Sequence, residues 1–124
     1  MIDFNKPDKK IVDILGTPYI FVLENRKDNP LYESNNSDGY CDSSVHEIHV
    51  AIEEPTPKSD MVPNVYRKAV ARHEIVHAFL HESGLSTCSG KYDCGWSMNE
   101  EMVDWIALQA PKMAKVFSMI GCYE

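Results

Sequence analysis

Two histidines, His73 and His77, stand four residues apart, and Glu74 follows the first of them. On a helix, residues four apart lie on the same face about one turn from each other, so both imidazoles can reach a single metal ion. Glu74 projects to the side of this pair, where a carboxylate can take a proton from a metal-bound water without being a ligand. The spacing therefore predicts half of a zinc site with a general base beside it.

A third ligand is available in the later sequence Asn99-Glu100-Glu101-Met102-Val103-Asp104. Glu100 on a second helix can complete a site of two histidines and one glutamate, and Asp104, one turn later on the same face, can hold a ligand histidine from behind. A capping box between Ser97 and Glu100 is an alternative role for this glutamate. We favour the ligand role, because capping leaves Asp104 unexplained.

The combined pattern, HExxH followed by NExxxD, resembles the gluzincin arrangement of zinc metallopeptidases. Its short spacing and the small chain are similar to the compact ImmA/IrrE-like and phage-encoded metallopeptidases. The stretches Ile14-Leu15-Gly16-Thr17, Gly39-Tyr40-Cys41-Asp42 and Asn99-Glu100-Glu101-Met102-Val103-Asp104-Trp105 look like the same group. The resemblance therefore runs through most of the chain.

The resemblance implies a role for each residue of the two motifs. His73, His77 and Glu100 would bind zinc, Glu74 would be the catalytic base, and Asp104 would support a ligand from behind. It also implies a minimal zincin-like fold of the α+β class, in which a small antiparallel or mixed sheet packs on the HExxH helix and on a second ligand-bearing helix. In such folds, the strand just before the metal-binding helix is an edge to which an extended peptide adds by backbone hydrogen bonds.

The other histidines fit the site less well. On a straight helix His81 would lie about 12 Å along the axis from His73, while zinc–nitrogen bonds are only about 2 Å long, so both cannot bind one ion. We expect His81 to be a supporting or surface residue. His46 and His49 are expected to be polar surface positions, and Tyr40 or Tyr92 could stabilise the oxyanion of a tetrahedral intermediate.

Composition limits the possible classes of protein. The 124 residues, of which 44% are hydrophobic and 25% charged, suit one globular domain spanning residues 1–124. A net charge of −7 without a basic cluster disfavours direct binding of nucleic acid. No apolar run could span a bilayer and the first residues lack the core of a signal peptide, so we expect a cytoplasmic protein that does not bind membranes.

The four cysteines, at positions 41, 88, 94 and 122, show no Cys-x-x-Cys spacing and are expected to be free thiols in a reducing compartment. Cys88 and Cys94 bracket a loop near the predicted site. A disulfide between them, or a thiolate that inhibits the metal, is therefore a less favoured alternative.

The first half of the chain predicts strands. Residues 11–15 and 19–23 are branched and aromatic runs around a Gly-Thr-Pro turn, which favours a hairpin, although a short helix from Pro7 to Leu15 is an alternative. Residues 24–39 are polar and predict a loop. In the stretch 47–52, Ile48, Val50 and Ile52 alternate with polar or small residues, which predicts a strand with one face in the core.

The second half predicts helices. A helix should begin near Pro63, carry the HExxH motif and end at Glu82 or Ser83, before Gly84. Residues 86–97 predict a loop that returns the chain to the site. A second helix should run to about Gln109, and Pro111 should start or kink a last helical segment.

These observations predict a zinc-dependent endopeptidase that hydrolyses peptide bonds of one or a few intracellular protein targets by zinc-activated water. An alternative is a catalytically silent module with the same fold that acts by occupying a protein partner. A metal-dependent hydrolase of another bond is less favoured, because the acidic chain suits nucleic-acid substrates poorly.

Overall fold

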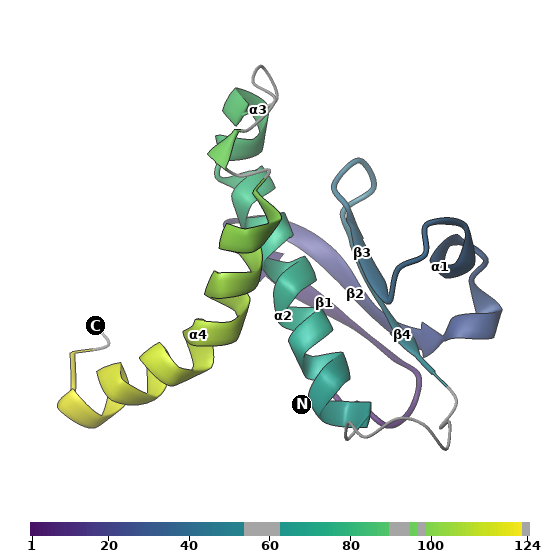
Figure 1. Ribbon diagram of the computed structural model, residues 1–124, viewed down its shortest axis with the longest axis horizontal. Helices are drawn as coiled ribbons and strands as arrows, with labels where there is room; N and C mark the ends of the chain where they lie inside the picture. Colours follow the sequence, from purple (N-terminus) through teal and green to yellow (C-terminus); the bar gives the residue numbers. More distant parts are fainter. Residues whose placement is uncertain (54–62, 90–94, 97–98, 123–124) are drawn as a thin grey trace.

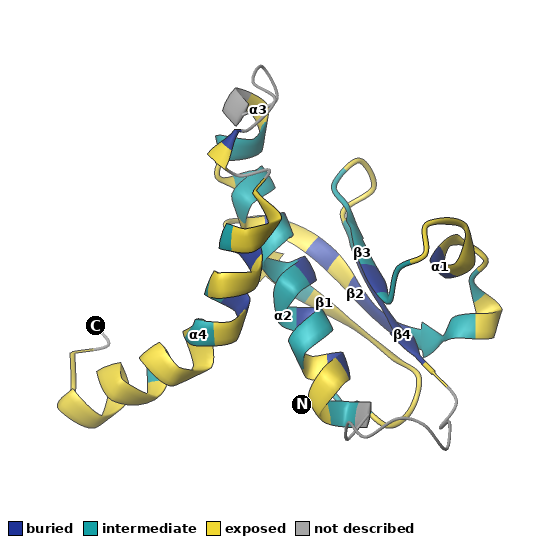
Figure 2. Cartoon of the chain, viewed as in Figure 1, coloured by how far each residue is buried: buried dark blue, intermediate teal, exposed yellow. Residues whose placement is uncertain are grey.

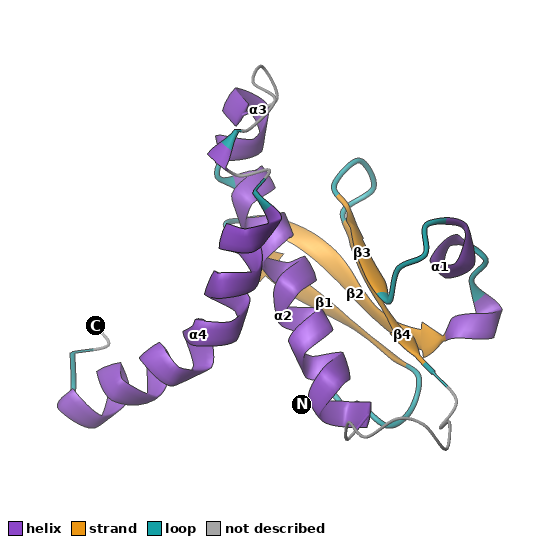
Figure 3. Cartoon of the chain, viewed as in Figure 1, coloured by secondary structure: helices purple, strands orange, loops and turns teal. Residues whose placement is uncertain are grey.

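The computed structural model describes residues 1–53, 63–89, 95–96 and 99–122, and it has an α+β architecture (Figure 1). A four-stranded mixed sheet has the order β1-β2-β4-β3 and carries helix α2 across one face (Figure 3). The elements are β1 (Asp8–Ile14), β2 (Thr17–Asn25), a 3-10 turn (Arg26–Asp28), α1 (Leu31–Ser34), β3 (Gly39–Asp42), β4 (Glu47–Ile52), α2 (Pro63–Glu82), α3 (Leu85–Ser89) and α4 (Glu100–Ile120). The α+β class is confirmed.

The hairpin prediction is also confirmed, although the turn lies at residues 15–16 and not at the expected residues 16–18. β1 and β2 pair antiparallel, and Ile14 faces Thr17 across a two-residue turn. Leu15 and Gly16 both have positive φ, 51° and 91°. Two successive left-handed residues match the right-handed twist of the flanking strands, as in the favoured hairpin turns. The alternative short helix over residues 7–15 is therefore wrong.

β4 lies in the interior of the sheet, because it pairs parallel with β2 on one side and antiparallel with β3 on the other. Ile48, Val50 and Ile52 face α2 and form the core together with Tyr19, Phe21, Leu23, Ala71 and Ala78. The placement of the three branched residues in the core is confirmed, but the strand is buried on both faces and its expected place at an edge is wrong. The edge strand next to α2, the helix that carries the HExxH motif, is β3. This strand precedes β4 in the chain.

The opposite face of the sheet contains a polar network around His49, which is only 8% exposed. Its Nδ1 lies 2.7 Å from Glu24 Oε1 and its Nε2 lies 2.8 Å from Glu47 Oε2, while the Tyr40 ring stacks on it at 4.5 Å. The Tyr40 hydroxyl accepts a hydrogen bond from Asn29. The structure therefore contradicts two predictions: His49 is a buried structural residue, and Tyr40 is engaged on the wrong face to stabilise an oxyanion.

Two segments that were expected to be loops, residues 24–39 and 86–97, contain residues of the short helices α1 and α3. Within residues 24–39, β2 continues to Asn25 and α1 follows, anchored by the fully buried Tyr32, whose hydroxyl donates to Glu24 at 2.8 Å. After α2, which ends at Glu82 as predicted, Gly84 adopts a φ of 86° and α3 begins at once.

Helix α4 begins at Glu100, with Asn99 as its N-cap: the Asn99 side chain accepts a hydrogen bond from the N–H of Met102 at 3.0 Å. Ser97 lies outside the described residues. Because Asn99 is the cap, Glu100 is the first residue of the helix and not the third, so its carboxylate does not have the position of a capping-box glutamate.

α4 continues through Pro111 to Ile120 as one helix, so Pro111 does not start a new helix, and α4 changes direction along its length (Figure 1). Proline has no N–H, so the carbonyl four residues earlier, that of Ala107, loses its partner within the helix. The guanidinium of Arg72 on α2 supplies a replacement, because its Nε donates to the Ala107 oxygen at 2.9 Å. This bond ties the two helices together beside His73.

Replacing Arg72 by leucine is expected to lower the free energy of unfolding by about 1–3 kcal/mol, because the carbonyl of the buried Ala107 loses its donor. With Pro111→Ala in the same chain, residue 111 can donate its own N–H to that carbonyl, so the Arg72 replacement should cost less. Urea unfolding of the wild type, both single variants and the double variant measures this coupling. Equal costs in the two backgrounds would contradict the role of the guanidinium.

Candidate metal centre

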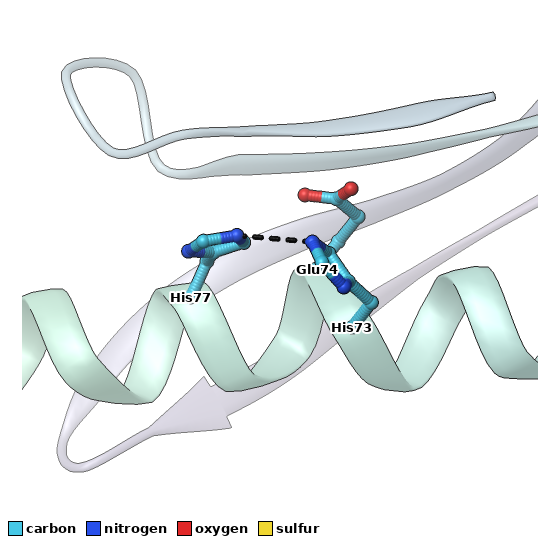
Figure 4. A group of neighbouring side chains, drawn as sticks. All are labelled: His73, Glu74 and His77. Atoms are coloured by element: carbon cyan, nitrogen blue, oxygen red, sulfur yellow. Dashed lines mark hydrogen bonds between the residues drawn. The ribbon is translucent and has the colours of Figure 1, made fainter. Parts of the chain in front are cut away.

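Three donor atoms from α2 and α4 form a nearly equilateral triangle. His73 Nε2 lies 3.1 Å from His77 Nε2, and Glu100 Oε2 lies 3.2 Å from the first nitrogen and 3.4 Å from the second. Figure 4 shows the two imidazole rings facing each other on one side of α2. A tetrahedral ion at about 2.1 Å from its ligands holds them about 3.4 Å apart, so these atoms have the separation that one ion requires.

Asp104 supports this triangle from behind. Its Oδ1 lies 2.6 Å from Nδ1 of His73, the ring nitrogen that points away from the other two donors. A carboxylate at this position holds the proton on Nδ1 and leaves Nε2 free to bind a metal. Glu100 and Asp104 stand one turn apart on α4, so the docking of this one helix brings both to His73. The structure thus brings together all the residues that the two motifs predicted.

Glu74 lies beside the triangle, and its side chain comes from the same turn of α2 (Figure 4). Donor atoms of His73, Glu74 and His77 all lie within 4.8 Å of one another. Glu74 is only 8% exposed, and this burial raises its pKa to about 7; His73 acts in the opposite direction, while the charges of Glu100 and Asp104 add to the rise. A carboxyl group with this pKa can both take and release a proton near neutral pH.

Gly39, at the start of β3, allows the edge strand to approach the site. A Cβ at this position would lie 2.6 Å from Cγ1 of Val70, 2.9 Å from the His49 carbonyl and 3.2 Å from Cγ of Glu74. Only glycine fits such a close approach of strand to helix. The sequence indicated no role of its own for this residue, although it begins the stretch that resembles the metallopeptidases.

A groove runs past the site between β3 and the helices. A cavity of about 490 Å³ extends toward His81 and Ser86, and a second of about 310 Å³ extends toward Tyr66. Both are lined by Ser37, Gly39, His73 and Glu74. Because the two cavities share these residues, the candidate centre lies in the middle of the groove. The groove extends from it in both directions.

The remaining candidates lie outside the triangle. His81 lines the larger cavity together with His73, Glu74 and His77. The His46 side chain is 47% exposed, as expected for a surface position. Tyr92 and Cys94 lie outside the described residues, as does the side chain of Cys88.

Two cysteines, Cys41 and Cys122, are free thiols, as expected. Burial raises the pKa of Cys41 to about 12, and the charge of nearby Glu74 adds to this effect. The Cys41 thiol therefore stays protonated near neutral pH and is a poor metal ligand.

Comparisons with protein-family models, curated proteins and solved structures found no match for this chain. In the parts of the chain that the structure describes, no helix is both long enough and apolar enough to cross a bilayer.

Proposed function

We propose that the protein is a zinc-dependent endopeptidase of gluzincin type, with His73, His77 and Glu100 as ligands and Glu74 as general base. The observation that carries the proposal is the triangle of donor atoms with sides of 3.1, 3.2 and 3.4 Å. Two imidazoles and one carboxylate suit zinc, and three protein ligands leave a fourth position open, as in catalytic rather than structural zinc sites.

When bound, zinc supplies a Lewis acid that polarises a peptide carbonyl and brings the pKa of water toward neutrality. Glu74 then accepts the proton of the attacking water and returns it to the leaving amine. Its burial, which raises its pKa to about 7, fits a group that must do both. Asp104 keeps the His73 ring oriented with Nε2 toward the ligand triangle.

Among the described residues, β3 is an outer strand of the sheet, and its unpaired edge supports a peptide substrate. The N–H of Ala51 donates to the Asp38 carbonyl at 2.9 Å, so these two residues form a hydrogen-bonded pair. Hydrogen-bonded and non-hydrogen-bonded pairs alternate along an antiparallel ladder, so Gly39 and Cys41 direct their N–H and C=O groups away from β4. An extended peptide can add to these groups and pass the candidate centre. In this proposal β3 takes the role that the sequence resemblance implied for the strand of residues 47–52.

The substrate class that this groove fits is an extended segment of a protein or peptide. Strand addition binds the backbone of the peptide by hydrogen bonds. The two cavities on either side of the centre can each receive side chains of the peptide. In the part of the chain that the structure describes, few elements border the groove, which favours one or a few protein targets over broad digestion.

Metal content tests the proposal directly. Protein purified without added metal is expected to hold about one zinc ion per chain by elemental mass spectrometry, and Glu100→Ala should reduce this sharply because one of three ligands is lost. Glu101→Ala is the matched control: it removes the neighbouring carboxylate, which no residue of the triangle contacts, and should keep full zinc.

Full zinc in Glu100→Ala would show that this carboxylate is not a ligand. Zinc in the wild type without any cleavage of casein or of a peptide library would favour the alternative of a silent binding module.

A further inference from the structure

The outer face of α4 carries large apolar side chains. Trp105, Leu108, Val116 and Met119 are 57%, 56%, 55% and 74% exposed. At 100° per residue these four project within an arc of about 80°, on the side of the helix opposite Val103 and Ala107, the buried residues that face α2. Figure 2 shows α4 mostly in the colour of exposed residues. Glu101 and Lys112 fall within the same arc, and we call these six residues the outer face.

The second half of α4 projects away from the sheet and from α2 (Figure 1). Residues 111–120 are exposed except for the half-buried Ala114. An isolated helical segment of about ten residues is marginally stable in water, so additional packing would stabilise this half of α4. Its apolar residues, and the regular spacing of the outer face, indicate that this helix packs against another molecule.

The order of charges on α4 indicates which molecule. Its three acidic residues, Glu100, Glu101 and Asp104, lie in the first half, and its two basic residues, Lys112 and Lys115, lie in the second. A parallel pair of such helices would place like charges together. An antiparallel pair places the acidic half of each helix against the basic half of the other and also opposes the two helix dipoles.

We propose that the outer face of α4 binds a second copy of this chain as an antiparallel helix pair. Two pairs of residues on the outer face have the same midpoint, between residues 106 and 107. The first pair is Glu101 and Lys112, and the second is Trp105 and Leu108. A two-fold axis at that point brings Glu101 to the partner's Lys112 and Trp105 to the partner's Leu108, twice each. This is the self-complementarity that a two-fold interface requires.

The apolar surface available is of the right size for a dimer. Val116 and Met119 lie on the far side of the axis, and Trp96, which precedes α4, is 57% exposed. The six side chains Trp96, Trp105, Leu108, Val116, Met119 and Ile120, each 55–74% exposed, offer on the order of 600 Å² per copy. A standard interface buries about 800 Å² per partner.

This dimer leaves both candidate metal centres accessible. Glu100 and Asp104 reach around the inner side of α4 to His73 on α2, and the groove lies beyond them along β3. The proposal is independent of catalysis, because it rests on the outer side of the helix and not on the groove.

Charge reversal tests the pairing in the full-length protein. Sedimentation equilibrium of the wild type at micromolar concentration is expected to give twice the chain mass of 14.1 kDa. Glu101→Lys and Lys112→Glu should each weaken dimerisation at least tenfold, because each homodimer would then contain two pairs of like charges. An equimolar mixture of the two variants should recover a dimer, since the mixed pair contains two pairs of opposite charges.

Two controls complete the experiment. Lys27→Glu makes the same charge change at an exposed site far from α4 and should dimerise as the wild type does. Trp105→Asp should give monomers with unchanged circular dichroism. A monomeric wild type at about 100 μM would overturn the proposal and leave the face to a different partner. A dimer that tolerates both charge reversals, or a mixture that stays monomeric, would overturn the antiparallel pairing.

Discussion

Replacing Glu74 by glutamine is expected to keep about one zinc ion per chain and to lower peptide hydrolysis by about 10²–10⁴-fold, the usual contribution of a positioned general base. Glutamine has nearly the shape of glutamate, so the buried position beside His73 and His77 remains filled. It cannot accept the proton of the attacking water. Cleavage of casein or of a peptide library, measured together with metal content, separates loss of the base from loss of the ion.

Glu101→Gln is the matched control for this experiment, because it makes the same chemical change next to Glu100, the proposed ligand, and should leave hydrolysis unchanged. Equal activity of Glu74→Gln and the wild type would remove Glu74 from the mechanism.

Folding provides a second control on the same variant, in protein stripped of metal. Burial raises the pKa of Glu74 from 4.5 to about 7, so the folded state favours the protonated carboxyl. The stability that this preference gives is present below the ordinary pKa and is lost as pH rises through about 7. Glutamine carries no charge at either pH, so the variant should gain stability relative to the wild type between pH 5 and pH 8. A lower melting temperature at pH 8 would indicate that the substitution damages the fold.

Replacing Gly39 by alanine is expected to lower the free energy of unfolding by about 2–3 kcal/mol, near the upper end for overpacking by one methyl group. The new Cβ would lie 2.6 Å from Val70 Cγ1 and 2.9 Å from the His49 carbonyl, and the carbonyl belongs to β4 and cannot rotate away. β3 must therefore shift relative to α2. The same shift would displace Glu74, whose Cγ lies 3.2 Å from the new methyl group, so catalysis should fall as well.

Val70→Ala in the same chain removes one of the two closest contacts and should recover part of the lost stability. Urea unfolding of the two single variants and the double variant measures this recovery. Gly121→Ala is a useful comparison, because no atom lies within 4 Å of a Cβ there and its cost should come only from its φ of 77°. A Gly39→Ala protein as stable as the wild type would contradict the close approach of β3 to α2.

Local features of the sequence were enough to predict the parts of the site that lie on single elements. The spacing of His73 and His77 on one helix, and that of Glu100 and Asp104 on another, follows from helical periodicity alone, which the structure bears out. The hairpin itself was also predicted, but its turn was expected at residues 16–18 and lies at Leu15 and Gly16, because leucine rarely adopts a positive φ and gives no signal for such a turn. The meeting of the two helices was inferred from the chemistry of the residues and not from any local pattern.

Features that depend on contacts between distant segments were missed or misplaced. The alternation of residues 47–52 predicts a strand with one buried face, but the pattern is the same whether the strand is at an edge or in the centre. Only the pairing of β4 with both β2 and β3 decided that. It buried His49 between two carboxylates and placed the Tyr40 ring on it.

The sequence by itself determined which residues could bind a metal and on which helices they lie, because periodicity along a chain fixes the direction of neighbouring side chains. The tertiary structure alone decided that β3 forms the edge beside the centre, that Gly39 admits it, and that Arg72 supplies the donor that Pro111 lacks. Each of these depends on atoms that are close in space and far apart in sequence. Such proximity results from packing the whole chain around one core, so it cannot be predicted from any short stretch of sequence.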